Sequence, residues 1–190
     1  MSAGKCRAPH GACHADGSPS KCFRHTLPQG VCAAAEDGDC KIAYSADGVN
    51  WTAVSNNTFG TYDKIYGIAY GDNRFVAVGD RGKMAYSTDG VNWTAISDST
   101  VWNYTNNGTT FPVGINAIAY GNGRFVAVGQ IGKMAYSADG INWTAVSNST
   151  VWIYTDTIAG TFPVSIRGIG YGNDRWVAGG GNGKMAYCDW

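Results

Sequence analysis

Short hydrophobic stretches of four to six residues recur along the chain, and polar turn-forming residues separate them. "RFVAVG" (74–79) and "KMAYS" (83–87) are two of them, and Gly, Asn and Asp fill the gaps between such stretches. Stretches of this length, rich in Val, Phe and Tyr, are typical of β-strands joined by tight turns. The chain has 27 glycines and a single glutamate, Glu36, which disfavours long helices. The pattern predicts an all-β protein.

The stretches are organised in repeats. One unit reads "GIAYG" (67–71), "RFVAVG" (74–79), "KMAYS" (83–87) and "NWTAIS" (92–97), and we name these segments A, B, C and D. All four recur between 117 and 147, and A, B and C recur between 168 and 188. The "DG" and "GDN" or "GNG" turns between them supply the positive φ angles that tight hairpins need.

A weaker unit precedes these three. "KIAYSADGVNWTAVS" provides its C and D, residues 31–35 are a degenerate B that aligns with two residues inserted, and its A falls near 22–27. Four units of four strands predict a small β-propeller with four antiparallel blades. We expect residues 1–30, a Cys/His-rich segment, to supply the missing last strand and close the ring of repeats 31–190. The alternative fold is a β-trefoil, which has units of similar size.

The C to D turns carry a recognisable motif. "S-x-D-G-x-N-W" resembles the Asp-box of BNR-type, sialidase-like propeller repeats, with one residue fewer between Asp and Gly; lectin-type propellers are a looser likeness. The resemblance implies a structural hairpin on the side away from the ligand, formed by three Asp–Trp pairs: Asp47 and Trp51, Asp89 and Trp93, Asp139 and Trp143.

Cysteines concentrate at the two ends of the chain: Cys6, Cys13, Cys22, Cys32 and Cys40 at one, Cys188 at the other. If all six pair within one chain, Cys188 bonds to one of the other five and ties the termini together, whichever of the fifteen connectivities holds. Paired cysteines indicate an extracellular protein. The alternative is zinc, because His10, His14 and His25 lie among these cysteines, although their spacing fits no common finger. We expect no metal and no cofactor.

Charge and hydropathy exclude several classes of function. The net charge is zero with 15% charged residues, so nothing favours nucleic acid, and no apolar run suffices for membrane insertion. The first residues lack the pattern of a signal peptide, so we expect that a leader, if the protein is secreted, has been removed.

The loops divide into a constant and a variable set. In a four-stranded up-and-down blade the A to B and C to D turns share one face, and the B to C and D to A loops share the other. The first set is nearly constant here and the second varies, so we place the binding site in the second set. Arg74, Arg124 and Arg175 open the B segments, and we expect them to support the turns.

Two long D to A loops, 97–115 and 147–166, both contain V-W-x-Y-T and T-F-P-V. Their aromatic side chains, among Thr and Asn, suit stacking on a sugar, with packing over the blades as the alternative. The expected ligand-binding residues are Trp102, Tyr104, Trp152, Tyr154, and, in the shorter first loop, Phe59 and Tyr62. Phe111 and Phe162 are expected in the core.

No arrangement of acid, base and nucleophile is recognisable, so we expect no enzyme. The sequence predicts an extracellular carbohydrate-binding module with a glycan or glycoprotein ligand. The alternative is a structural or protein-interaction subunit that forms homo- or hetero-oligomers.

Overall fold

The structure is a computed structural model that describes residues 22–23, 32–35, 41–60, 62–97, 100–147, 150–157 and 160–189. Within these ranges the regular structure consists of β-strands and short 3₁₀ turns, and no helix is long and apolar enough to cross a membrane. The all-β prediction is confirmed.

Four antiparallel sheets follow one another along the described chain, each made of consecutive strands. The first contains β1 (Cys22–Phe23), β2 (Cys32–Ala35), β3 (Ile42–Ser45) and β4 (Thr52–Ala53). The second contains β5 (Ile65–Gly71), β6 (Arg74–Gly79), β7 (Met84–Ser87) and β8 (Thr94–Ala95). The third contains β11 (Ile115–Gly121), β12 (Arg124–Gly129), β13 (Met134–Ser137) and β14 (Thr144–Ala145). The fourth contains β17 (Ile166–Gly172), β18 (Arg175–Gly180) and β19 (Met185–Asp189).

The sequence segments A to D therefore correspond to strands in order. The degenerate first unit is also a sheet, with β2 as its B strand and β1 as its A strand. Its register corrects the sequence alignment: Cys32 lies opposite Ser45 as Phe75 lies opposite Ser87. The B to C connection of the first unit is thus one residue longer than that of the second, not two, because the strand begins one residue later.

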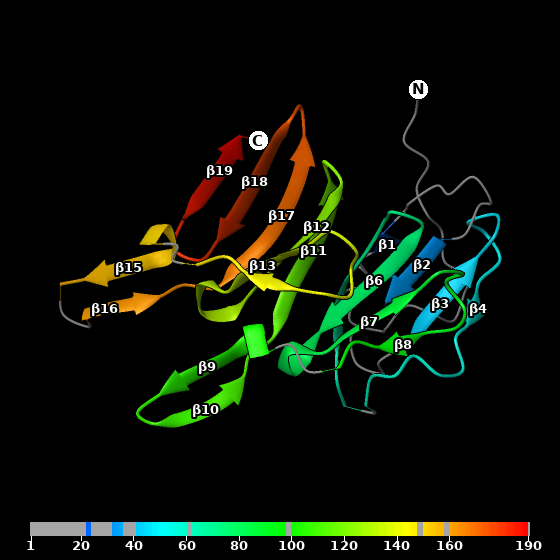
Figure 1. The fold of residues 1–190 in the computed structure, drawn as a ribbon, viewed down its shortest axis with the longest axis horizontal. Helices are drawn as coiled ribbons and strands as arrows, with labels where there is room; N and C mark the ends of the chain where they lie inside the picture. The colour runs from blue at the N-terminus through cyan, green and yellow to red at the C-terminus, as the bar shows by residue number, and fades with distance from the viewer. Residues whose placement is uncertain are drawn as a thin grey trace, which may run out of the picture.

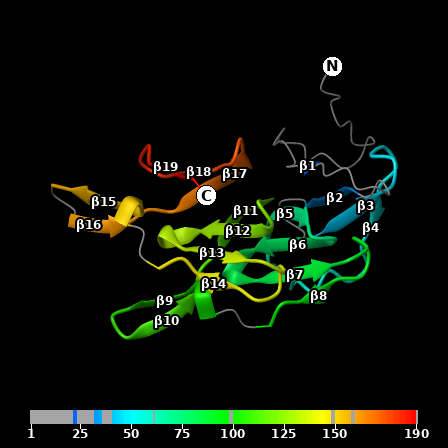
Figure 2. The ribbon, with the colours of Figure 1, turned by 45° about the horizontal axis from the view of Figure 1, so that its top comes forward.

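The four sheets lie in a row, with their A strands next to one another (Figures 1 and 2). β5 packs against β2 on one side and β11 on the other, and β17 packs against β11. Sheets stacked face to face in chain order are the blades of a propeller, which disfavours the trefoil alternative. In both views the first and fourth sheets lie at opposite ends of the row.

Ring closure by the N-terminal segment involves residues 1–21, which lie outside the described residues, as do Cys6, Cys13 and Cys40. Cys188 is exposed on β19. The terminal disulfide, the boundary at residue 30 and the zinc alternative therefore stay predictions.

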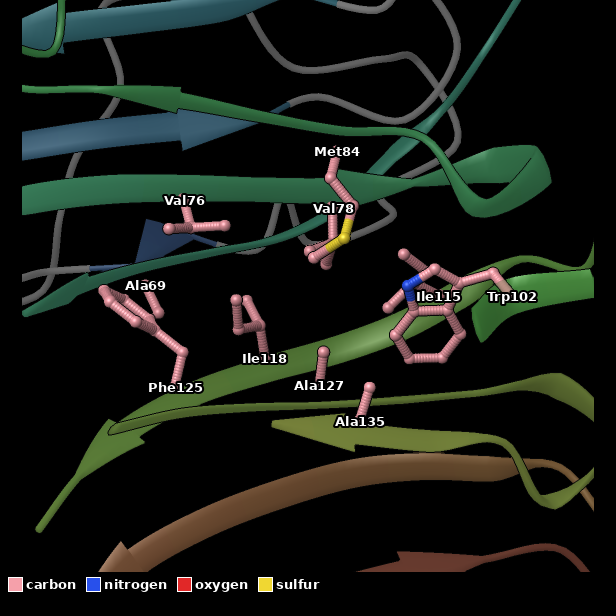
Figure 3. Packing of buried hydrophobic residues seen from close by; sticks show 10 residues of the cluster. All are labelled: Ala69, Val76, Val78, Met84, Trp102, Ile115, Ile118, Phe125, Ala127 and Ala135. Carbon is pink, nitrogen blue, oxygen red and sulfur yellow. The ribbon is translucent and has the colours of Figure 1, made fainter. Parts of the chain in front are cut away.

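The largest core cluster lies between the second and third sheets (Figure 3). Val76 and Val78 of β6 meet Ile115 and Ile118 of β11, and all four are at most 6% exposed. Each such side chain contributes about 1.5–3 kcal/mol when fully buried. The face of one sheet therefore becomes stable only when the next sheet covers it.

Candidate functional site

The B to C and D to A loops share one face of the row, as predicted. Asp80 begins the 3₁₀ turn η1 (Asp80–Gly82), and its carboxylate accepts a hydrogen bond from the Lys64 backbone N–H at 3.0 Å. In η3 (Gln130–Gly132) the Gln130 side chain accepts one from the Gly114 N–H at 3.1 Å. Each of these two B to C turns is thus tied to the D to A loop that enters the same sheet. We name this side of the row the variable face.

The Asp-box turns hold themselves together through the aspartate carboxylate. In the second sheet, Asp89 Oδ1 accepts hydrogen bonds from the backbone N–H groups of Val91 and Asn92, both at 2.8 Å. It also accepts one from the Ser87 hydroxyl at 2.9 Å, and the Trp93 indole donates to the Gly90 carbonyl at 3.1 Å. Asp47 and Asp139 have the same partners in their own turns. Trp51 and Trp143 are half-buried and Trp93 is buried. Every carboxylate oxygen of the three boxes thus serves its own turn.

The Asp-box turns lie on the side opposite the variable face, which we name the constant side. An arginine links neighbouring sheets there. The Arg74 guanidinium, at the start of β6, donates a hydrogen bond to the Asp139 carbonyl of the third sheet's box. The same guanidinium lies 5.3 Å from the Tyr86 ring centre. This geometry gives Arg74 the supporting role expected from its position beside the turns.

The hydrogen bonds also lower the pKa of the aspartate carboxyl group in each Asp-box. In Asp47 the backbone N–H groups of Asn50 and Val49 hold the carboxyl pKa well below its usual range. In Asp89 and Asp139 burial opposes ionisation, but the hydrogen bonds outweigh it, and the pKa is again lowered. The folded protein therefore binds fewer protons at these groups than the unfolded chain does.

We expect this difference to make the fold sensitive to acid. The stabilisation by a carboxyl with a lowered pKa is complete above its unfolded pKa of about 4 and is lost as the pH falls through the folded value. Thermal melts between about pH 7 and pH 2 should give a constant melting temperature above pH 5 and a steep decrease below pH 4. Asp89→Ala should show a smaller decrease because one contributor is gone. A melting temperature that does not change down to pH 2 would contradict the assignment.

The two long D to A loops form hairpins that stand out from the sheets (Figures 1 and 2). The first consists of β9 (Asn103–Asn106) and β10 (Thr109–Pro112), and the second of β15 (Ile153–Asp156) and β16 (Gly160–Pro163). These segments, predicted as loops, are thus strand pairs. The sequence signal for the first one is Asn107–Gly108, a dipeptide with φ of 49° and 78° that favours a two-residue hairpin turn.

The tryptophans at the base of these hairpins are buried, which corrects their predicted role. Trp102 ends η2 (Thr100–Trp102) and is 0% exposed, and Trp152 ends η4 (Thr150–Trp152) and is 2% exposed. Trp102 packs among Val78, Met84 and Ile115 between the second and third sheets (Figure 3). Trp152 belongs to the corresponding cluster of the third and fourth sheets. Their indoles anchor the hairpins to the core and present no face to a ligand.

The phenylalanines, expected in the core, are instead exposed. Phe111 lies opposite Tyr104 in the first hairpin, with ring centres 5.6 Å apart, and Phe162 lies opposite Tyr154 in the second at 5.3 Å. Phe111 is 40% exposed and Phe162 36%, whereas both tyrosines are half-buried. Because each phenylalanine sits on a two-stranded hairpin beyond the sheets, the other sheets do not cover it. Each hairpin thus carries one aromatic pair.

Hydroxyl groups occupy the alternate positions of each hairpin. The Thr105 and Thr110 hydroxyls lie 2.7 Å apart across the first hairpin, and those of Thr155 and Thr161 lie 3.1 Å apart across the second. All four threonines are exposed. Because side chains alternate between the faces of a strand pair, each hairpin has an aromatic side and a threonine side. The tyrosine–phenylalanine pair and the threonine pair recur in both copies.

The short first D to A loop differs from the long ones. Phe59 is half-buried against the cluster of the second sheet, whereas Tyr62 is 89% exposed. Asp63, which follows Tyr62 in the same loop, is only 1% exposed. Its carboxylate accepts hydrogen bonds from Arg81 and Lys83. Burial opposes ionisation of Asp63, but Lys83 and Arg81 keep its pKa below the usual value. The buried charge is therefore matched by two cations and serves the loop.

The part of the chain that the structure describes contains no cluster of metal-binding side chains. No three His, Cys, Asp or Glu side chains there gather closely enough to hold an ion. The candidate site within the described residues therefore consists of the aromatic hairpins β9–β10 and β15–β16. Of the predicted ligand-binding residues, Tyr104 lies beside Phe111 in the first hairpin and Tyr154 lies beside Phe162 in the second.

Comparisons with known proteins extend the fold assignment. No protein-family model matches the chain, and no curated protein matches it either. Among solved structures, the chain is similar to the computationally designed Ika4 protein, with 12% identity and a TM-score of 0.54 over 92% of this chain and 94% of that one. It is similar to the designed Ika8 protein with 12% identity and a TM-score of 0.55, over 92% of this chain and 47% of that one.

A natural enzyme is among the similar structures. A streptogramin B lyase structure matches with 14% identity and a TM-score of 0.54, over 87% of this chain and 53% of that one. The chain thus spans about half the length of Ika8 and of the lyase. At such identities the likeness concerns the fold, and together with the row of antiparallel sheets it shows that the chain has the architecture of the β-propeller proteins.

Proposed function

We propose that the protein is a non-catalytic, extracellular binding module that contacts carbohydrate through the aromatic hairpins. The observation that carries the proposal is the exposure of Phe111 and Phe162, each paired with a tyrosine at the same place in two equivalent hairpins. An exposed ring can stack on the C–H face of a sugar, and the hydroxyl of the paired tyrosine can bond to the hydroxyls of the sugar. Two like sites on one rigid body suit a ligand with repeated sugars, such as a glycan or glycoprotein.

Four of the described carboxylates have structural partners, which supports a binding role rather than catalysis for them. Asp47, Asp89 and Asp139 are engaged in their own turns, and Asp63 is held by Arg81 and Lys83. A general acid or base works best with a pKa near the operating pH, whereas these four pKa values are lowered. The extracellular location rests on the six cysteines and the disulfides predicted for them. The Asp-box relationship belongs to the same proposal.

A glycan array tests this function directly. We expect wild-type protein to bind a subset of glycans and the double variant Phe111→Ala/Phe162→Ala to bind them about tenfold more weakly or worse, since two stacking contacts are lost. The matched control is Asp89→Ala on the opposite face. It should lower the melting temperature by roughly 2–4 °C, as a loss of about 1 kcal/mol does in a chain of this size, and leave binding unchanged.

Two outcomes would overturn the carbohydrate proposal. One is an array that stays silent at high protein concentration although the protein is folded. The other is a double variant that binds glycans as strongly as the wild type does. Loss of binding in Asp89→Ala, without loss of stability, would instead place the site on the constant side.

One observation favours the second candidate function, a protein-interaction subunit. Val177, Met185 and Tyr187 of the fourth sheet are 42%, 74% and 69% exposed on neighbouring strands. Contiguous apolar side chains of this kind mark protein contacts more often than sugar sites. They lie on the strands of the last sheet in the row and belong to neither hairpin, which makes this a separate surface.

A further inference from the structure

The fourth sheet presents one flat side that is covered in the second sheet. Val76 and Met84 of the second sheet are 0% and 4% exposed, and Tyr86 is half-buried, whereas Val177, Met185 and Tyr187 at the same repeat positions are largely exposed. Gly168, Gly170 and Gly172 lie on the same side of β17, by the alternation of the strand. We name these six residues the open face: Gly168, Gly170, Gly172, Val177, Met185 and Tyr187.

In the second and third sheets, side chains of the next sheet pack over the glycines at these positions. A Cβ at Gly71 would overlap the Tyr120 ring of the third sheet, and a Cβ at Gly67 would lie 3.3 Å from Ile118. One sheet further along, the Tyr171 ring occupies the place over Gly121 in the same way. On the open face, no described atom lies within 4 Å of a Cβ placed at Gly168, Gly170 or Gly172. The face has the small residues that receive another sheet, and among the described residues no sheet is there.

The N-terminal segment alone does not have the side chains to replace a sheet. Residues 1–21 and 36–40 contain no Ile, Val, Leu, Phe, Tyr or Trp, and residues 24–31 contain only Leu27 and Val31 of these types. The sheet-to-sheet contacts within the chain depend on such residues, as Val76, Ile118 and Phe125 show in the cluster of Figure 3. A strand added at the edge of β19 would also leave the flat side of the sheet uncovered. The occupant of the open face must therefore be a sheet.

The first sheet is at the opposite end of the row from the open face in both views (Figures 1 and 2). The chain matches about half the length of Ika8 and of the lyase, so a row of this length can occupy half of a larger ring. A row that forms half of a ring leaves two ends unpaired. A second copy, turned by half a revolution about the ring axis, brings each first sheet to the other copy's open face.

We infer that the open face binds the first sheet of a second copy of this chain, so that two copies complete one propeller. Both contacts in such a ring are identical and head-to-tail, and the rotation closes it. The contact continues the packing already present between the second, third and fourth sheets. The inference does not rest on the carbohydrate proposal, because no residue of the open face belongs to a hairpin.

Sedimentation velocity over a wide range of protein concentration tests the inference. We expect wild-type protein to have twice the mass of one chain. Val177→Arg, which places a charge on the open face, should weaken association about tenfold or more. The matched control is Val146→Arg, since Val146 is 39% exposed beside β14 and off the open face, and this variant should remain dimeric. Should Val177→Arg fail to fold, Met185→Glu changes the most exposed of the apolar residues and should act alike.

Hydrogen exchange separates the possible geometries. Head-to-tail closure should protect amides of both the first and the fourth sheets in wild-type protein relative to Val177→Arg. A monomer at all concentrations would overturn the inference and favour closure by the chain's own first sheet. Protection confined to β17–β19 in a dimer would also overturn it, because the two open faces would then pair with each other. A mass above two chains would exclude the closed ring.

Discussion

Trp102→Ala is expected to destabilise the protein by about 3–5 kcal/mol, the usual cost of removing a buried indole. The side chain is 0% exposed and fills the space between the second and third sheets beside Met84 and Ile115. It also holds the base of the hairpin, since the Trp102 carbonyl accepts a hydrogen bond from the Val113 N–H at 2.8 Å. Chemical denaturation followed by tryptophan fluorescence and circular dichroism measures the loss.

Phe111→Ala is the control for this prediction. Phe111 belongs to the same hairpin, but it is 40% exposed and lies beyond the sheets. Its removal should cost much less than that of Trp102, and the two variants should respond in opposite ways: Trp102→Ala loses stability, Phe111→Ala loses ligand binding. Equal losses of stability would mean that the hairpin packs as a unit of the core. A stable Trp102→Ala variant with impaired binding would restore the ligand role first expected for this residue.

The arrangement of the strands could be predicted because local signals and the repeat agree. "RFVAVG" has β-branched and aromatic residues, its neighbours have turn formers, and β6 and β12 begin and end at its boundaries. Even the weak first unit could be located, since β2 (Cys32–Ala35) lies within the predicted segment. Repetition makes a weak local signal readable by comparison with its stronger copies.

The candidate site could be predicted only in part, because burial depends on partners that sequence patterns do not specify. "V-W-x-Y-T" and "T-F-P-V" predict a site rich in aromatic residues, but the pattern does not specify which aromatic side chain points into the core. The alternation within the hairpin places Tyr104 and Phe111 side by side, and the 3₁₀ turn before it directs Trp102 into the core. The Asn107–Gly108 turn was the available signal for this arrangement.

The inferred dimer would affect the proposed binding function through geometry. A half-turn about the ring axis keeps the variable faces of both copies on the same side, so four hairpins rather than two would point toward one ligand surface. Binding at several weak sites raises the apparent affinity for a multivalent ligand by much more than it does for a single sugar. Val177→Arg should therefore weaken binding to a densely glycosylated surface while leaving binding to a soluble monosaccharide unchanged.

Gly71→Ala is expected to produce the second large effect, through overpacking. A methyl group at Gly71 would overlap the Tyr120 ring, which lies in a tightly packed contact between the second and third sheets. Forcing a side chain into such a contact typically costs 1–3 kcal/mol, because the ring or a strand must move. Gly121→Ala should behave alike, since Tyr171 occupies the equivalent place. The free energy of unfolding, from urea denaturation, measures both.

Gly172→Ala supplies the matched comparison, because Gly172 holds the same repeat position on the open face, where no described atom lies within 4 Å of the added Cβ. Measured in the Val177→Arg background, which keeps the open face uncovered, it should change the free energy of unfolding by less than about 0.5 kcal/mol, as surface substitutions usually do. A large loss there would mean that a tyrosine-like contact covers Gly172 within a single chain, which is the in-chain ring closure. The same substitution at Gly71, Gly121 and Gly172, which share one repeat position, thus shows which sheets have this face covered by a neighbouring sheet.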